Sequence, residues 1–168
     1  MAATAIKTNA EKLSREKRTV ALMSVAAASA MTVLKIVAGI LSGSLGMLSD
    51  AAHSGLDLLG AGLTFFSVGI SDRPADEDHT YGHAKIENIS AFTETFLMAA
   101  SCVWIVSEAV QRIFLHPKDV KASVWPFAVL LLYMAVDYWR SHQLNAVARR
   151  TGSSALEADA LHFASDIW

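Results

Sequence analysis

Two stretches of the chain share one pattern of acidic residues and histidine, D-x-x-H-x-x-x-D. The first stretch supplies Asp50, His53 and Asp57, and the second supplies Asp159, His162 and Asp166. Offsets of three, four and seven residues fall on one face of an α-helix. Each stretch therefore predicts a stripe of two carboxylates and one imidazole, a combination that binds divalent metal cations.

Both stripes lie in apolar sequence, where ionised groups are costly. A carboxylate at the centre of a bilayer costs at least about 2.5–3.5 kcal/mol. The acidic groups would also repel one another unless a cation offsets them, and Lys35 is the nearest candidate. These costs favour metal binding over the alternative, in which the polar groups only satisfy one another inside the protein.

The apolar sequence around the stripes predicts helices that span a membrane. Hydrophobic residues make up 53% of the 168 residues and charged residues only 18%, whereas a soluble domain carries about 25% charged residues. A spanning helix needs about 20 mostly apolar residues. The candidates are residues 19–41, 45–70, 89–114, 124–147 and 154–168. We expect an all-α, polytopic membrane helix bundle with five transmembrane helices, the fifth incomplete.

The distribution of Lys and Arg predicts the orientation, because cytoplasmic loops carry an excess of these residues. Nine of them precede the first helix or lie in the second and fourth connections, against three in the third. We therefore expect residues 1–18 to be a cytoplasmic segment and residues 19–168 to be the transmembrane domain of a protein of the cell inner membrane. The net charge of −2 gives no indication of a nucleic-acid partner.

The second and fifth helices cross in opposite directions, which brings the two stripes to matching depths. At about 1.5 Å per residue, His53 and Asp57 lie roughly 12 and 18 Å below the outer face. By the same measure, His162 and Asp166 lie roughly 12 and 18 Å above the inner face. In a membrane core of about 30 Å, the four side chains meet near the midplane.

Three further acidic residues are candidates for supporting roles. Asp50 and Asp159 lie one helical turn from the midplane set, towards opposite faces, as entry or exit groups or as partners of the ligands. Glu94 is expected to face the interior of the bundle, either on a proton or ion path or as a structural hydrogen-bond partner. Asp137 and Arg140, three residues apart, indicate an ordinary ion pair within one helix.

Two imidazoles and two carboxylates in a tetrahedral arrangement suit Zn²⁺, which has no geometric preference of its own. The same set would accept Co²⁺, Cd²⁺, Fe²⁺ or Mn²⁺, so geometry and supply must help to select the metal. Ca²⁺ and Mg²⁺ prefer more oxygen ligands. The sequence predicts Zn²⁺ as the ion that is transported and no organic cofactor.

The connection between the second and third helices contains a second candidate metal site. Asp76, His79 and His83 have a spacing that is compatible with metal binding, and Glu77 or Asp78 could replace Asp76 as the oxygen ligand. The alternative is a solvated loop in which these side chains bind no metal.

The residues that carry this chemistry look like those of the cation diffusion facilitator family of metal transporters. The resemblance is clearest from Ser49 to Asp57, from Pro74 to His83 and from Leu161 to Asp166, and it runs from about Val20 to the last residue. It implies six helices followed by a soluble cytoplasmic metal-binding domain that dimerises, so that the full-length protein would be a homodimer.

The resemblance also implies the transport site and its coupling. The family's ligand pairs on helices two and five correspond to His53, Asp57, His162 and Asp166, and His53 resembles the form associated with zinc preference. Export of Zn²⁺ in exchange for protons is implied. The sixth helix and the C-terminal cytoplasmic domain are absent from this sequence, so we expect that the chain as given does not transport.

Two other classes of function remain open. A membrane protein that binds or senses metal without moving it would contain the same ligands. A membrane metalloenzyme would need an open coordination position for its substrate, whereas four protein ligands would close this site. The sequence therefore favours a secondary active transporter over an enzyme.

Overall fold

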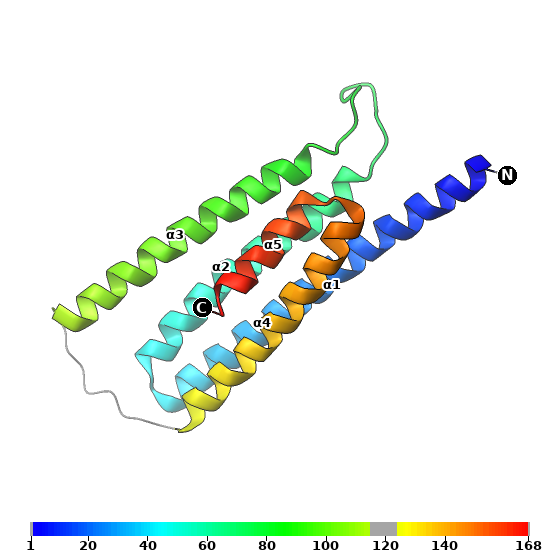
Figure 1. Ribbon diagram of the computed structural model, residues 1–168. Coiled ribbons are helices and arrows are strands. Elements are labelled where there is room, and N and C mark those ends of the chain that lie inside the picture. The colour runs from blue at the N-terminus through cyan, green and yellow to red at the C-terminus, as the bar shows by residue number, and fades with distance from the viewer. Residues whose placement is uncertain (1, 115–123, 168) are drawn as a thin grey trace.

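The computed structural model describes residues 2–114 and 124–167 of the chain. Over these residues the chain forms five α-helices and no strand (Figure 1). The helices are α1 (Ala2–Ser42), α2 (Leu45–Ser71), α3 (Ile86–Phe114), α4 (Val124–Thr151) and α5 (Ser154–Ser165). The prediction of an all-α bundle is confirmed.

Helices α1 and α2 form an antiparallel hairpin that is closed by a tight turn. Gly43 has a φ of 61°, in the left-handed region that glycine adopts most readily. The side chain of Ser44 caps α2 by accepting a hydrogen bond from the N–H of Met47 at 3.3 Å. We call this end of the bundle the hairpin end, and the opposite end, which carries residues 72–85, the loop end.

Helix α5 lies alongside α2 and between α3 and α4 (Figure 1). The contact of α5 with α2 brings the two D-x-x-H-x-x-x-D stripes together. Small residues such as Ala21 and Ala61 are fully buried in the core and allow close packing. The larger Leu156 and Phe163 of α5 are fully buried as well. Small residues let helix backbones approach each other where no water drives association.

Within the described residues, three helical segments are long and apolar enough to cross a membrane. They are Thr8–Ser42, Leu45–Ser71 and Ile86–Gln111. Helix α4 is long enough, but Asp137 and Arg140 interrupt its apolar sequence, and α5 has only 12 residues. Of the five helices that were expected to span the membrane, α1, α2 and α3 therefore have the length and composition of a spanning helix within the described residues.

Helix α1 begins earlier than expected, whereas α5 begins at the expected residue, behind a serine cap. Helix α1 continues through residues 2–18 instead of beginning at residue 19. The cap of α5 is Ser153, whose extended backbone lets its side chain accept a hydrogen bond from the N–H of Leu156 at 3.4 Å. The neighbouring Ser154 instead donates to Asn88 Oδ1 at 2.8 Å.

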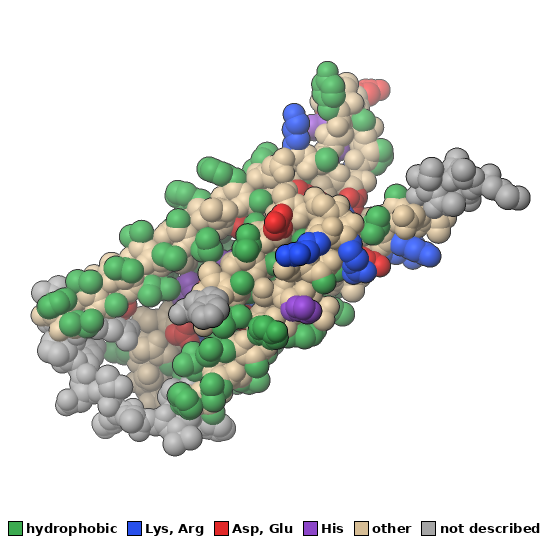
Figure 2. Space-filling view, viewed as in Figure 1, with side chains coloured by type: hydrophobic (Ala, Val, Ile, Leu, Met, Phe, Trp, Pro, Cys, Tyr) green, Lys and Arg blue, Asp and Glu red, His purple; other side chains and the backbone are tan. Residues whose placement is uncertain are grey.

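The outer surface of the bundle is apolar over most of its length. Hydrophobic side chains cover α3 and the lower part of α4 in Figure 2, whereas Lys and Arg gather where α4 meets α5. Phe92, Phe96 and Val103 of α3 are among the large apolar residues that are exposed. Such a surface costs about 25 cal/mol per Å² in water, and contact with lipid removes that cost.

Candidate metal site

The stripes on α2 and α5 each bring one imidazole and one carboxylate to a common point. His162 Nε2 lies 3.1 Å from Asp57 Oδ1, which connects α5 to α2. On α2, His53 Nε2 lies 3.7 Å from the same carboxylate oxygen. On α5, His162 Nε2 lies 3.8 Å from Asp166 Oδ2. Ligand atoms of His53, Asp57 and Asp166 all fall within 4.8 Å of one another.

These separations are close to those of a metal site. Bonds of about 2.0–2.1 Å in a tetrahedral zinc site place neighbouring ligand atoms roughly 3.3 Å apart. The pairs joined by Asp57 Oδ1 are already within a few tenths of an ångström of that value, at 3.1 and 3.7 Å. Small side-chain movements would complete the coordination.

Burial makes the polar atoms of this cluster costly unless they are paired. Asp57 is 3% exposed and His162 is 9% exposed. Among the described residues, Asp166 Oδ2 and His53 Nδ1 are buried and have no hydrogen-bond partner. A buried polar atom without a partner costs about 1–3 kcal/mol, and a bound cation would satisfy the carboxylate oxygen.

Helix α5 ends at Ser165 and Asp166 is its C-cap, although the sequence indicated a helix to residue 168. The backbone of Asp166 keeps helical angles, φ −69° and ψ −15°, and its N–H bonds to the carbonyl of His162 at 3.2 Å. Its side chain therefore remains on the same face as that of His162, one turn away.

A tyrosine from α4 also approaches the cluster. The hydroxyl of Tyr133 donates to Asp57 Oδ2 at 3.5 Å, while Asp57 Oδ1 faces the two imidazoles. Both oxygens of this carboxylate are therefore engaged. The spacing of residues in α4 gave no signal for Tyr133, because an isolated tyrosine in an apolar run is also typical of packing or of a membrane interface.

A cavity of about 320 Å³ reaches His53 from the hairpin end. Its walls come from the first half of α2 and the last half of α3, including Ser49, Asp50, Trp104 and Glu108. Asp50 is thus placed on the approach to the cluster and outside it. Of the four residues in the two imidazole–carboxylate pairs, His53 is the one that lines this cavity.

The other outlying acids lie apart from the cluster, towards the loop end. Asp159 Oδ2 accepts a hydrogen bond from Ser24 at 3.0 Å, and Glu94 Oε1 accepts one from Thr64 at 2.5 Å. Within the described residues, the second oxygen of each carboxylate is buried without a hydrogen-bond partner. Glu94 does face the bundle interior, as the sequence indicated.

The pair Asp137–Arg140 is not an ordinary surface pair. Its atoms lie 3.1 Å apart, and the side chains are 0% and 2% exposed. Arg140 also donates to Ser24 at 3.0 Å and lies 3.4 Å from the ring centroid of Phe163. Because Ser24 in turn donates to Asp159, Arg140 supplies a buried positive charge near that acid. The i,i+3 spacing predicted the pair but not its burial, because such a pair is equally typical of a solvated helix face.

Glu87 joins four helices at the loop end. Its carboxylate accepts hydrogen bonds from Ser71 at 2.6 Å, Ser153 at 2.5 Å and Lys17 at 3.1 Å. Lys17 also pairs with Asp72. We call these five residues the Glu87 clamp. It was not anticipated, because its members are scattered over 137 positions of sequence, from Lys17 to Ser153, without a motif.

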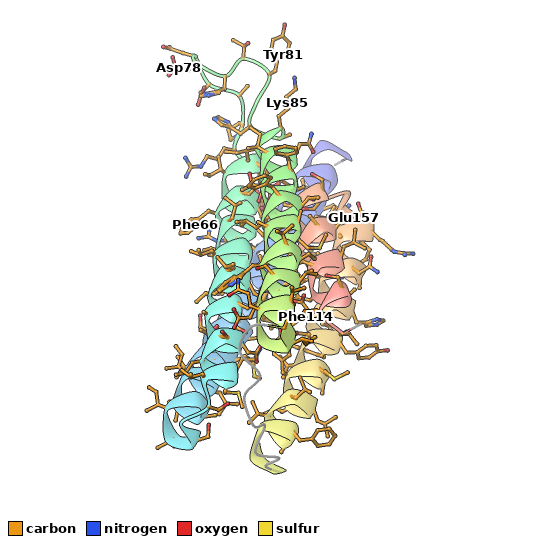
Figure 3. The ribbon with its side chains drawn as sticks, turned by 90° about the vertical axis from the view of Figure 1, so that its left-hand side faces the viewer. Phe66, Asp78, Tyr81, Lys85, Phe114 and Glu157 are labelled. Atoms are coloured by element: carbon orange, nitrogen blue, oxygen red, sulfur yellow. The ribbon has the colours of Figure 1, made fainter. Side chains whose placement is uncertain are left out.

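The loop between α2 and α3 brings its candidate ligands together. Asp76 Oδ1 lies 3.1 Å from His79 Nδ1, and Asp76 Oδ2 lies 3.5 Å from His83 Nε2. The cluster uses Asp76, and not Glu77 or Asp78. In Figure 3 the loop extends beyond the helices, with Asp78 and Tyr81 at its tip.

A turn fixes Asp76 in this position. The backbone N–H of His79 donates to Asp76 Oδ1 at 2.7 Å, and Gly82 supplies a left-handed residue with φ 76°. The hydrogen bond from the His79 backbone, and then the His79 side chain, hold the pKa of the Asp76 carboxyl below its ordinary value. The carboxylate therefore stays ionised and available as a ligand at neutral pH.

Fold and cluster together define an integral membrane helix bundle whose interior holds histidine and carboxylate side chains of the types that can bind metal. Residues 21–168 match the profile described as the cation efflux transmembrane domain. The chain belongs to this cation efflux family, also called the cation diffusion facilitators. The resemblance noted in the sequence is thereby confirmed.

Individual relatives agree with the family. An uncharacterized transporter of Synechocystis is 32% identical over 154 residues, which is 92% of this chain and 49% of the relative. The cation-efflux pump FieF of Serratia proteamaculans is 30% identical over 154 residues, covering 89% and 50% of the two chains. FieF of Klebsiella pneumoniae is 29% identical over 147 residues, covering 88% and 49%. The chain spans about half the length of the curated relatives it matches.

Proposed function

We propose that this chain is the membrane domain of a divalent metal efflux transporter that exchanges Zn²⁺ for protons. His53 and Asp57 of α2 and His162 and Asp166 of α5 would bind the transported ion. The observation that carries the proposal is the convergence of these four side chains, with Asp57 Oδ1 at 3.7 and 3.1 Å from the two imidazoles. The names of the FieF relatives, cation-efflux pumps, support the direction of transport.

The chemistry of the ligands couples metal to protons. Zn²⁺ binds neutral imidazole and ionised carboxylate, so binding displaces protons and release allows them to return. If the site opens alternately to the two faces, protons bind on the side where the metal is released and leave on the side where the next metal ion binds. Movement of helices around a fixed midplane site is the usual way in which transporters achieve this.

The arrangement and the relatives together favour a transporter over the two alternatives. An enzyme needs an open coordination position, whereas four protein ligands fill a tetrahedral zinc site. A metal sensor would contain the same ligands and the same cavity of about 320 Å³ beside His53, but the names of the relatives, cation-efflux pumps, favour transport. A sensor and a transporter differ in flux, which can be measured directly.

Metal binding tests the site first. We expect His162→Ala to weaken Zn²⁺ binding to the purified chain by at least about 100-fold, since it removes one of four ligands. His142→Ala is the matched control, because His142 is exposed on α4 and stacks on Tyr138. Calorimetry at neutral pH measures both variants. Unchanged Zn²⁺ affinity in His162→Ala would show that the assignment of the site is wrong.

Flux then separates transport from binding. The chain is joined to the C-terminal half of a full-length relative and placed in vesicles that contain a zinc-sensitive dye. Zn²⁺ entry that follows an imposed pH gradient, and that is lost in His162→Ala, is the expected result. Stoichiometric Zn²⁺ binding without any flux would instead support the sensor.

We also propose that Asp76, His79 and His83 bind a second Zn²⁺ at the loop end. The supporting observation is that their ligand atoms lie within 4.8 Å of one another. His79 and Asp76 are more than half exposed, so water competes and the site should be weaker than the buried one. Calorimetry of the His79→Ala, His83→Ala double variant should lose one weak binding event and keep the strong one. An unchanged titration would favour the solvated loop.

The orientation and assembly complete the proposal. We place the protein in the cell inner membrane with the N-terminus and the loop end in the cytoplasm, and we propose a homodimer for the full-length protein. The gathering of Lys and Arg where α4 meets α5 supports this orientation (Figure 2). A protease that is added from the outside should leave the 72–85 loop intact in cells and cleave it in inverted vesicles.

A further inference from the structure

Lys35 is a fully buried cation beside the candidate metal site. The residue lies in the last third of α1, towards the hairpin end, and is only 1% exposed. Its Nζ atom lies 3.1 Å from Asp50 Oδ2 and 3.2 Å from Asp50 Oδ1, so it engages both oxygens of that carboxylate. It also donates to Ser54 Oγ at 2.8 Å.

The aromatic ring of Tyr133 also contacts the ammonium group of Lys35. Lys35 Nζ lies 3.3 Å from the centroid of the tyrosine ring, a cation–π contact. The hydroxyl of the same tyrosine reaches Asp57 Oδ2 at 3.5 Å. Lys35 therefore contacts Asp50 directly and is linked to the ligand Asp57 through one side chain.

Asp50 lies one helical turn from His53, outside the cluster, and its carboxylate is held by Lys35. It precedes His53 by three residues on the same face of α2, and both residues line the cavity. Among the described residues, Asp50 is the only carboxylate within ion-pair distance of Lys35. If Asp50 turned to a metal ion, the charge of Lys35 would be left buried and unpaired, which is strongly unfavourable.

We propose that Lys35 is a specificity-determining residue, a built-in cation that keeps Asp50 out of the metal's ligand set. The site is then limited to two imidazoles and two carboxylates, which suits Zn²⁺. A third carboxylate would make it richer in oxygen and more favourable to Mn²⁺. This inference rests on the proposed function, because it concerns the ions that the proposed site selects.

The experiment compares Zn²⁺ and Mn²⁺ binding to the purified chain by competition calorimetry. In Lys35→Gln, Asp50 is released, and we expect the affinity for Mn²⁺ relative to Zn²⁺ to rise by about tenfold, the lower end of the effect of groups that support metal ligands. In the double variant Lys35→Gln, Asp50→Asn, the extra carboxylate is absent and the ratio should return to that of the unmodified chain. Lys12→Gln is the control, since Lys12 is exposed on the same helix.

A second measurement does not need metal. Lys35→Gln and Asp50→Asn should each lower the Tm of the metal-free chain, because each leaves one buried or half-buried group without its partner. The double variant should lose less than the sum of the two single losses. This result shows the pairing, and the metal ratio shows its consequence for specificity.

The outcomes separate this inference from the proposed function. If the unmodified chain binds Zn²⁺ through His162 but Lys35→Gln leaves the Mn²⁺ to Zn²⁺ ratio unchanged, Lys35 is a structural residue and the inference is wrong. A raised ratio that the double variant fails to reverse would also overturn it, because Asp50 would not be the cause. If His162→Ala does not affect Zn²⁺ binding, the proposed function fails and the inference fails with it.

Discussion

Among the proposed ligands, His53 is the one best suited to substitution, because it borders the cavity and its side chain is partly exposed. Replacing it by aspartate gives a site with one imidazole and three carboxylates. A site with more oxygen ligands and fewer imidazoles accepts a larger ion such as Cd²⁺ more readily. We therefore predict that His53→Asp raises the affinity for Cd²⁺ relative to Zn²⁺ by about tenfold, measured by competition between the two metals.

The matched control for His53→Asp is His142→Asp, which places the same new charge on an exposed position of α4. That variant should leave the Cd²⁺ to Zn²⁺ ratio unchanged. If His53→Asp also leaves it unchanged, the first stripe does not contribute to the choice of metal.

The loop ligand Asp76 allows the source of pH dependence to be assigned. Its folded pKa lies below the ordinary value, so the turn that it stabilises is complete above the ordinary pKa and is lost only as the pH falls through the lower, folded value. Between pH 7 and 5 the carboxylate therefore stays ionised. Histidine side chains ordinarily change charge in this range. We predict that loop Zn²⁺ binding weakens from pH 7 to 5 by the same factor in Asp76→Asn as in the unmodified chain.

Calorimetry in the His162→Ala background isolates the loop site for this comparison. Asp76→Asn should be weaker at every pH, because it removes one ligand charge, and the two curves should remain parallel. Curves that converge at low pH would show that protonation of Asp76 takes part, contrary to the prediction.

At the residue scale, the sequence predicted which side chains meet but not what surrounds them. The i,i+3 and i,i+4 spacing and the opposite directions of two helices suffice to bring Asp57 to His162, which lie 3.1 Å apart. Tyr133 and Arg140 contribute through contacts between α4 and other helices. No spacing within a helix encodes such contacts, since they depend on how the helices rotate against one another.

At the scale of helices, α1 and α2 pack closely near the hairpin end, where Gly39 of α1 lies against Leu48 of α2. A Cβ atom at Gly39 would lie 2.8 Å from Leu48 Cδ2 and 3.2 Å from the backbone N of Leu48. Because a backbone atom cannot move aside as a side chain can, the two helices would have to separate. We predict that Gly39→Ala destabilises the chain by about 1–3 kcal/mol, the usual cost of overpacking.

Gly62→Ala is the control, because a Cβ atom at that position of α2 would meet nothing within 4 Å. Alanine is the better helix former by about 1 kcal/mol, so this variant should be neutral or slightly stabilising. Thermal unfolding in detergent compares the two. Equal Tm values for both variants would mean that the hairpin tolerates a wider separation.

The start of α5 gives a second test at this scale. Ser153 accepts from the N–H of Leu156 and donates to Glu87 Oε2 at 2.5 Å, and it is 3% exposed. We predict that Ser153→Ala costs about 1–2 kcal/mol, as expected for the loss of a helix cap. Ser154→Ala, at the adjacent half-buried position, should cost less than half of that. A larger loss in Ser154→Ala than in Ser153→Ala would contradict the assignment of the cap.

Helix positions were accessible from the sequence, and helix ends were less so. Long apolar runs predicted α2 almost to the residue, Leu45–Ser71 against 45–70. The choice of Ser153 over Ser154 as the cap depends on backbone angles and on the buried carboxylate of Glu87. A pair of adjacent serines carries no information about either.

At the scale of the whole molecule, the described residues form a cavity at one end of the bundle and a buried ionic network at the other. The cavity of about 320 Å³ reaches His53 from the hairpin end, whereas the Glu87 clamp joins α1, α2, α3 and the cap of α5 at the loop end. The sequence could not indicate this difference, because both features are built from residues that lie far apart in the chain. This asymmetry is a property of contacts between helices.

The last prediction concerns the balance between these two ends. Glu87 is 7% exposed and accepts from Lys17, Ser71 and Ser153. Glu87→Ala leaves a buried lysine and two hydroxyl groups without this partner, at a cost of about 1–3 kcal/mol, because Lys17 keeps its ion pair with Asp72. That cost falls on the state in which the loop end is closed, so the population should shift towards any state in which these helices separate and admit water. Entry to the cavity from the hairpin end should then become rarer.

Labelling of a cysteine in the cavity measures this shift. Ser49 lines the cavity, so Ser49→Cys, in a chain whose exposed Cys102 is replaced by serine, should react quickly with a membrane-impermeant maleimide added at the hairpin end. We expect Glu87→Ala to slow this reaction by about tenfold, since about 1.4 kcal/mol of the lost stabilisation is enough for that change in population. Glu157→Ala is the control, because Glu157 points outward from α5 in Figure 3 and is exposed. An equal labelling rate in Glu87→Ala and Glu157→Ala, with both proteins folded, would show that the clamp stabilises the bundle without controlling which end is open.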